Sequence, residues 1–400
     1  MRVRRVEGAP VVAVRLWATG GARVEDVPGQ ALVSGRLLNE GTRRRDWRRL
    51  ADDSEAYGMN VSSLGTFEGH GVSVDALAKD WELALDWAAE MLLDSTFPED
   101  RSRWLARQAA AELESLADEP DTRTGWAFLE QLYAPHPRRR PVQGDPESLR
   151  RLGAGDCARF HQQSLRRGVI AAVAGTIDAE AVERRLHSLL GELGPVSDPC
   201  PQPAAPVGLP EARREILVDA EDQANLFVGQ LTLPRRHPDH AALELLAVVL
   251  GSGAGLTGRI PARIREREGL AYTAHAQTVA GSGLDPGRLY AYVGTAPETV
   301  ERAERGVKEE IARLVEDGLG DDELAEARAY LLGREPFQRE TARQWADLLI
   351  DAEHYALPLD DPAWRTAQLN ACTRSDVESA ARRHLHPGEL RTTVGLPRPG

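Results

Sequence analysis

The chain alternates between two hydrophobic patterns. Residues 10–21, PVVAVRLWATGG, are β-branched, alternate in polarity and end in a glycine pair, which predicts a strand and a turn. Residues 61–77 show the same period of two, and residues 168–177, GVIAAVAGTI, form the continuous apolar run typical of a central strand. Helical periodicity fills the stretches between and after them: 29–39, 43–57, 76–95, 98–118, 148–166 and 179–193.

The same order of patterns recurs in the second part of the chain. It predicts a strand at 224–233, a helix at 240–253, a strand pair at 271–296, helices at 298–318, 321–337 and 375–385, and a closing strand at 391–396. Strands followed by runs of helices favour an α+β fold. We therefore expect two similar halves, each a mixed or antiparallel sheet with packed helices.

A proline-rich segment separates the two halves. Residues 194–210 contain six prolines in seventeen positions, so neither a helix nor a central strand can form there. This predicts a first half at 1–195, an extended linker at 196–210 and a second half at 211–400.

Composition restricts the partners of the chain. With 42% apolar and 28% charged residues, it has the balance of a folded protein, and its net charge of -13 repels nucleic acid and anionic membranes. We expect neither as a partner. The acidity suits a basic substrate, although it also serves solubility alone. Three distant cysteines without CxxC spacing argue against a disulfide framework and against a cysteine-based zinc site.

The sequence also bears on the compartment. No run approaches the roughly 20 apolar residues of a membrane span, and the N-terminus, MRVRRVEGAPVVAVRLW, lacks the apolar core of a signal peptide. The expected location is the cytoplasm, with a processed periplasmic form as the alternative.

Several ordered segments resemble the insulinase-type, or mitochondrial processing peptidase-like (pitrilysin-type), metallopeptidases. The matching segments are PVVAVRLWATGGARVEDVPG, LLNEGT, RRPVQGDPESLRRL, GVIAAVAGTID and, most specifically, RIPARIREREGLAYTAHA. The resemblance implies two α+β halves that close like a clam on a cavity. It also implies a zinc site in catalytic members, built from HxxEH on a first-half helix and a more distant Glu.

This chain departs from that zinc motif. Aligning GQALVSGRLLNEGT, residues 29–42, on the pattern puts Leu32 and Arg36 at the histidine positions and Gly35 at the general-base Glu, while Glu112 falls where the third ligand would be. Leucine has no lone pair, arginine is a permanent cation and glycine cannot accept a proton. The resemblance therefore implies no metal in this chain and no activity of the chain alone. Glu112 is more simply a helix carboxylate or an ion-pair partner of Arg36.

A second family feature is retained. In catalytic members an Arg and a Tyr hold the substrate backbone and stabilise the oxyanion, and Arg265 and Tyr272 stand at the matching positions in RIREREGLAY. The simpler interpretation makes Arg265 a surface charge on a helix and Tyr272 a half-buried strand residue.

The remaining histidines offer no ligand set by spacing. His237 and His240 are three apart around a proline, and His384 and His386 flank a leucine, so each is expected to be a loop or surface residue. His70, in FEGHGVSV, is expected on a strand.

The resemblance points to one function and leaves one alternative. The chain looks like the non-catalytic subunit of a heterodimeric zinc metalloendopeptidase. Such a subunit binds extended peptide and supplies Arg265 and Tyr272 to a zinc site in an HxxEH-containing partner. The alternative is a pseudo-peptidase, for example a homodimer, that acts as a peptide-binding scaffold or assembly subunit.

Overall fold

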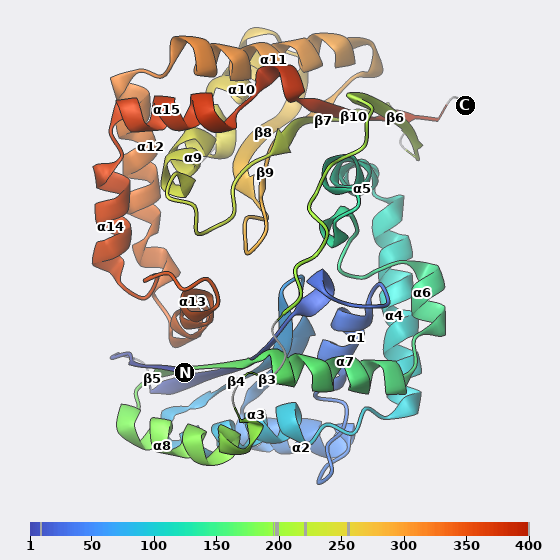
Figure 1. Cartoon of the computed structure of the whole chain (residues 1–400), viewed down its shortest axis with the longest axis vertical. Coiled ribbons are helices and arrows are strands. Elements are labelled where there is room, and N and C mark those ends of the chain that lie inside the picture. The colour runs from blue at the N-terminus through green and yellow to red at the C-terminus, as the bar shows by residue number, and fades with distance from the viewer. Residues whose placement is uncertain (9, 195, 197–199, 220–221, 254–256, 399–400) are drawn as a thin grey trace. The chain divides into compact units, whose positions relative to one another are not determined.

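The computed structural model describes residues 1–8, 10–194, 196, 200–219, 222–253 and 257–398 (Figure 1). These residues form two compact units. Unit 1 comprises Met1–Glu114, Arg140–Ala204 and Phe337–Asp360, and unit 2 comprises Ser115–Arg139, Ala205–Pro336 and Asp361–Gly400. Each unit contains one five-stranded mixed sheet with packed helices, which confirms the predicted α+β class with two similar halves.

The sheet of unit 1 has the strand order β1-β5-β2-β4-β3. Its strands are β1 (Arg2–Arg5), β2 (Val11–Thr19), β3 (Asn60–Gly65), β4 (Gly69–Leu77) and β5 (Val169–Gly175). The pair β1–β5 is parallel and the other pairs are antiparallel. The apolar run at 168–177 thus forms an interior strand, as its pattern predicts.

The sheet of unit 2 repeats this topology strand for strand. Its order is β6-β10-β7-β9-β8, with β6–β10 parallel and the other pairs antiparallel. The strands are β6 (Arg213–Val218), β7 (Ala224–Leu231), β8 (Ala271–Ala280), β9 (Arg288–Thr295) and β10 (Arg391–Pro397). In both units the first strand pairs in parallel with the last, so the repeat of patterns in the sequence reflects a repeat of architecture.

Helices cover the sheets. Unit 1 contains α1 (Gln30–Leu37), α2 (Trp47–Tyr57), α3 (Trp81–Leu93), most of α4 (Glu99–Asp118), α6 (Pro146–Arg151), α7 (Ala154–Arg167), α8 (Ala179–Leu190) and α13 (Ala342–His354). Unit 2 contains α5 (Pro120–Tyr133), α9 (His240–Ala247), α10 (Arg259–Pro261), the π-helical segments η5 (Val248–Ser252) and η7 (Ala262–Arg267), α11 (Val300–Asp317), α12 (Asp321–Arg334), α14 (Pro362–Ala371) and α15 (Arg374–His384). No described helix is long and apolar enough to cross a membrane.

The compact units differ from the linear halves because two helices are exchanged. Helix α13, from the second half of the chain, packs on β5 and β2 of unit 1 (Figure 1). Its Trp345 and Leu349 cover the small residues Ala13 and Ala172, on the face opposite the main core. Buried Arg15 lies on the same face and donates to Asp347 at 2.6 Å.

Helix α5 comes from the first half of the chain but belongs to unit 2, where it packs on the sheet. It packs on β10 and β7. Phe128 stacks on Phe227 with ring centroids 5.6 Å apart, and Thr393 donates to Gln131 at 2.7 Å. Sequence analysis did not predict α5, because Glu119-Pro120 reads as the end of the preceding helix. Pro120 also begins α5, where its missing N–H costs nothing.

The proline-rich linker has no regular structure at the described positions 200–210, and it is tied to both units. Arg23 donates to the carbonyl of Pro201 at 2.9 Å and to the side chain of Gln202 at 2.8 Å, and Leu209 donates to the carbonyl of Gln131 at 2.8 Å. Positions 197–199 of the predicted linker lie outside the described residues.

Two buried histidines form a hydrogen-bonded pair in unit 1. His161 Nε2 lies 2.7 Å from the carbonyl of Leu92, which can only accept, so Nε2 carries the proton. His161 Nδ1 therefore accepts from His70 Nε2 at 2.8 Å. Burial lowers the pKa of His161 to about 4 and also lowers the pKa of His70. Both imidazoles are neutral in the folded protein at neutral pH.

This pair should make stability depend on pH. Since both folded-state pKa values lie below the usual 6.5, the unfolded chain binds more protons, and stability is lost as pH falls below about 6.5. In urea unfolding, the wild type should lose about 2 kcal/mol more than His161→Gln between pH 7.5 and 5. The exposed His187→Gln should behave as wild type. If the unfolding free energies of wild type and His161→Gln fell in parallel as the pH is lowered, the assignment of a neutral, buried His161 would be contradicted.

Candidate functional site

The helix at the degenerate zinc position, α1, is in backbone contact with strand β3. A Cβ atom on Gly35 would lie 2.4 Å from the backbone nitrogen of Gly65, and one on Gly65 would lie 2.1 Å from the carbonyl oxygen of Ala31. Real Cβ contacts are not this short, so each glycine is required by the other element. A glutamate at position 35 cannot be accommodated unless α1 moves away from β3.

The other positions of the motif have structural partners. Leu32 is 8% exposed and belongs to the core of unit 1. Arg36 and Glu112 form a bidentate ion pair, with Nη1–Oε1 at 3.0 Å and Nη2–Oε2 at 2.8 Å. The two side chains are 27% and 43% exposed, so we expect a contribution of at most about 1 kcal/mol. These residues do not fit a zinc ion, because Glu112 is the lone metal-binding type among them and its carboxylate is neutralised by Arg36.

The N-terminus of α1 is held by its neighbours in unit 1. Both carboxylate oxygens of Glu25 accept backbone N–H bonds, from Gly29 at 3.1 Å and Ala31 at 2.9 Å. Burial raises the pKa of Glu25 to about 7. A Cβ on Gly144 would lie 2.4 Å from the carbonyl carbon of Pro28. The RRPVQGDPESLRRL segment therefore packs directly on the entry to the motif helix.

Arg265 and Tyr272 lie together in unit 2. Arg265 is in η7, and its Cζ lies 5.4 Å from the centroid of the Tyr272 ring, within cation–π range. Tyr272 is 83% exposed, so it is not the half-buried strand residue of the simpler interpretation.

The flanking arginines of η7 are engaged differently. Arg263 pairs with Glu268 at 2.8 Å and Glu309 at 2.5 Å, and Arg267 lies 3.7 Å from Glu310. For Arg265, the described part of the chain offers no carboxylate partner. Its guanidinium instead faces the ring of Tyr272.

Tyr272 lines a groove of about 840 Å³ in unit 2. The groove is formed where α5, β7 and β8 begin and β9 ends, and its lining residues are Glu119, Pro120, Asp121, Asp222, Gln223, Asn225, Gly269, Leu270, Ala271, Tyr272, Tyr292, Gly294, Thr295 and Ala296. At its base Tyr292 donates to Asn225 at 2.8 Å. Burial, assisted by the charge of Asp121, raises the pKa of Tyr292 to about 12, so this hydroxyl remains a donor.

Sequence reasoning missed this groove and one other cluster. The groove residues come from four separate stretches, three of which meet because β7, β9 and β8 are neighbours in the sheet. The structure also brings His237, Asp239 and His384 together, whereas spacing had paired His237 with His240 and His384 with His386. Among the residues of the groove and of this cluster, only Tyr272 could be predicted as functional from the sequence, because it lies in the motif RIREREGLAY.

Two units with the same five-stranded sheet, a motif helix without HxxEH side chains and an adjacent Arg–Tyr pair are features of a peptidase-like fold. Comparison with known proteins agrees. The model of the insulinase family (Peptidase family M16) matches residues 3–145, and that of the Peptidase M16 inactive domain matches residues 160–331. The chain belongs to the insulinase, or M16, peptidase family.

The similar proteins include some named as zinc proteases and one named as a non-peptidase homolog. An uncharacterised zinc protease of Streptomyces coelicolor is 27% identical over 327 residues, 80% of this chain and 70% of the relative. A Helicobacter pylori protein named non-peptidase homolog YmxG is 22% identical over 392 residues, 96% and 89% of the two chains. The crystal structure of a peptidase M16 inactive domain from Pseudomonas fluorescens has a TM-score of 0.90 at 23% identity and covers 100% of this chain and 95% of that one. These comparisons support a non-catalytic member of the family.

The contact between α1 and β3 can be tested by adding one methyl group. Gly35→Ala should lower the unfolding free energy by about 1–3 kcal/mol or more, because its Cβ meets backbone atoms that cannot rotate away. Gly333→Ala, in α12, is the matched control because its Cβ meets nothing within 4 Å. It should be neutral or stabilising by about 0.5–1 kcal/mol. Equal effects of the two substitutions in urea unfolding would refute the close contact.

Proposed function

We propose that this chain is the non-catalytic, substrate-binding subunit of a heterodimeric zinc endopeptidase. In this proposal a homologous partner with an intact HxxEH helix holds the zinc, and this chain supplies Arg265 and Tyr272 to the reaction. The observation that carries the proposal is the contrast between the two units. Unit 1 lacks the HxxEH side chains and the space for a glutamate at position 35, while unit 2 presents Arg265 beside the exposed ring of Tyr272.

The chemistry of the pair suits peptide hydrolysis. Attack of a zinc-bound water on a peptide carbonyl produces an oxyanion, which fixed hydrogen-bond donors stabilise. The guanidinium of Arg265 is a permanent cation with several donors, and the hydroxyl of Tyr272 is a neutral donor. The 83% exposure of Tyr272 leaves this hydroxyl free to reach a ligand.

The substrate in this proposal is an extended peptide. Strand β8, which carries Tyr272, pairs with β9 on one side and is the last strand of its sheet. An edge strand offers backbone N–H and C=O groups to an added peptide strand. The adjoining groove provides room for substrate side chains, and its carboxylates Glu119, Asp121 and Asp222 favour basic ones.

A scaffold or assembly function is the second candidate. It is favoured by the name of the Helicobacter pylori relative, a non-peptidase homolog. In that case the Arg–Tyr pair would bind peptide without contributing to hydrolysis, and a homodimer would suffice.

Reconstitution with an HxxEH-containing homologue separates these functions. The isolated chain should cleave no peptide, and the mixture should cleave in a chelator-sensitive way. Arg265→Ala or Tyr272→Phe should each lower kcat of the mixture by about 10²–10³-fold, the usual effect of losing one oxyanion donor. Arg267→Ala, on the same helical segment, should leave kcat unchanged.

Two results would count against the proposal. Chelator-sensitive hydrolysis by the isolated chain would place a working metal site within it. Full activity of both the Arg265→Ala and Tyr272→Phe mixtures would favour the scaffold function.

A further inference from the structure

Two histidines and one aspartate meet at the N-terminus of α9. One ring nitrogen each of His237 and His384 and one carboxylate oxygen of Asp239 lie within 4.8 Å of one another. The rings of His237 and His384 are edge to face, with centroids 5.1 Å apart. All three side chains are partly exposed, so the cluster can be reached from solvent. In the described parts of the chain, no other three metal-ligating side chains come this close.

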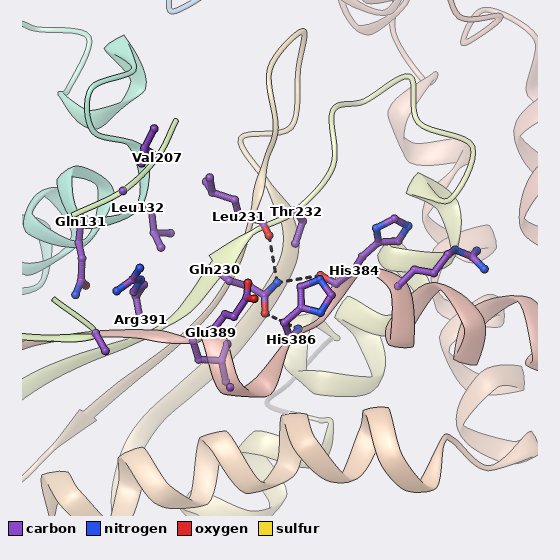
Figure 2. A pocket seen from close by; sticks show the side chains of 15 residues that line it. Gln131, Leu132, Val207, Gln230, Leu231, Thr232, His384, His386, Glu389 and Arg391 are labelled. Carbon is purple, nitrogen blue, oxygen red and sulfur yellow. Dashed lines mark hydrogen bonds between the residues drawn. The ribbon is translucent and has the colours of Figure 1, made fainter. Parts of the chain in front are cut away.

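The backbone around His384 is fixed by a buried glutamine. Figure 2 shows the side-chain amide of Gln230 bonded to the backbone of residues 384–386. The amide donates to the carbonyl of His384 at 2.9 Å and accepts from the backbone N–H of His386 at 2.8 Å. Gln230 is 7% exposed. The imidazole of His384 therefore projects from a segment whose position is set by β7.

The other two residues are fixed by the start of α9. Asp239 is the residue before the first turn, and its carbonyl accepts from Leu243 at 3.1 Å. The backbone carbonyl of His237 accepts from His240 at 3.0 Å, and its Nδ1 accepts from the N–H of Asp239 at 3.1 Å. Helix α9 follows β7 as α1 follows β2, so the cluster lies at the counterpart, in unit 2, of the helix that carries the degenerate zinc motif.

The carboxylate of Asp239 retains capacity for a further ligand. Its Oδ2 accepts from His384 Nε2 at 2.6 Å and from Arg383 at 2.9 and 3.1 Å. It makes no side-chain capping bond to α9, and the described contacts leave Oδ1 open. Arg383 can keep its bonds to Oδ2 while another atom binds Oδ1. Such an outer hydrogen bond is common for carboxylates that ligate metals.

We propose that His237, Asp239 and His384 form an accessory binding site for a divalent transition metal ion of the zinc type, separate from the degenerate α1 site. Two imidazoles and one carboxylate select Zn²⁺ and its neighbours Co²⁺, Ni²⁺ and Cu²⁺ over Ca²⁺ and Mg²⁺, which prefer oxygen ligands. With metal–ligand bonds of about 2.0–2.1 Å, ligand atoms lie about 3.3–3.5 Å apart. The ligand atoms now lie within 4.8 Å of one another, and rotation of the three side chains brings them to the distances that a bound metal requires.

Metal binding at this site replaces contacts within the cluster. Nε2 of His384 releases the proton of its hydrogen bond to Asp239, either to Nδ1 of the same ring or to solvent, and binds the metal instead, while water completes the coordination. His240 is not counted as a ligand, because it does not belong to the group of ligand atoms that lie within 4.8 Å of one another. Its Nδ1 faces Glu244 at 3.3 Å. The expectation of a chain without metal concerned the HxxEH position, and it stays a prediction. The proposed site does not supply the HxxEH geometry, and its existence does not depend on a peptidase function of the chain.

Titration of the full chain with Co²⁺ and Zn²⁺, after removal of metal by a chelator, tests the proposal. The Co²⁺ absorption in the visible region and native mass spectrometry should both show one equivalent per chain. His384→Gln and His237→Gln should each weaken binding by about 100-fold or more. The amide in His384→Gln can still donate to Asp239, so a merely structural role would be preserved in that variant.

Asp239→Asn should also weaken binding, and α9 should remain intact because no capping bond of this side chain is lost. The controls are His386→Gln, which changes an exposed histidine two positions away, and Glu112→Gln, which changes the α1 position. Both should bind as wild type. Absence of saturable binding by the wild type, or equal binding by the His237, Asp239 and His384 variants, would overturn the proposal.

Discussion

The backbone contact between Gly35 of α1 and Gly65 of β3 is the constraint on which the rest of the site depends. It draws the motif helix onto the sheet and removes the space that a general base would need. It places Leu32 in the core and leaves Arg36 at the surface, where it pairs with Glu112. The packing of unit 1 therefore excludes the general base, and restoring the three motif side chains alone would not recover a catalytic site unless α1 moved away from β3.

Unit 2 repeats the architecture of unit 1 but carries different candidate functional side chains, Arg265 and Tyr272. The same strand order places β8 at the sheet edge beside a groove, and η7 holds Arg265 against the exposed ring of Tyr272. Helices α5 and α13 are exchanged between the linear halves, so each sheet is covered on one face by a helix from the other half. Folding of either unit thus requires segments from both halves of the chain.

Hydrophobic periodicity was sufficient to predict the repeat and the interior strand β5, because these depend on local pattern. It did not reveal α5, whose first residue, Pro120, also ends the preceding helix. The degenerate motif was visible from residue types alone, whereas the reason for Gly35 depends on Gly65, thirty residues away, and appears only in the packing. The groove and the cluster of His237, Asp239 and His384 join distant stretches, so no spacing could have signalled them.

In the proposed function, unit 2 stabilises a transition state formed on a partner's zinc. The most direct measurement is the affinity of the assembled complex for a phosphinic peptide, which mimics the tetrahedral intermediate, beside that for the matching substrate peptide. Tyr272→Phe should weaken binding of the phosphinic peptide far more than binding of the substrate peptide, because the Tyr272 hydroxyl acts on the oxyanion. Equal affinity of wild type and Tyr272→Phe for the phosphinic peptide would contradict it.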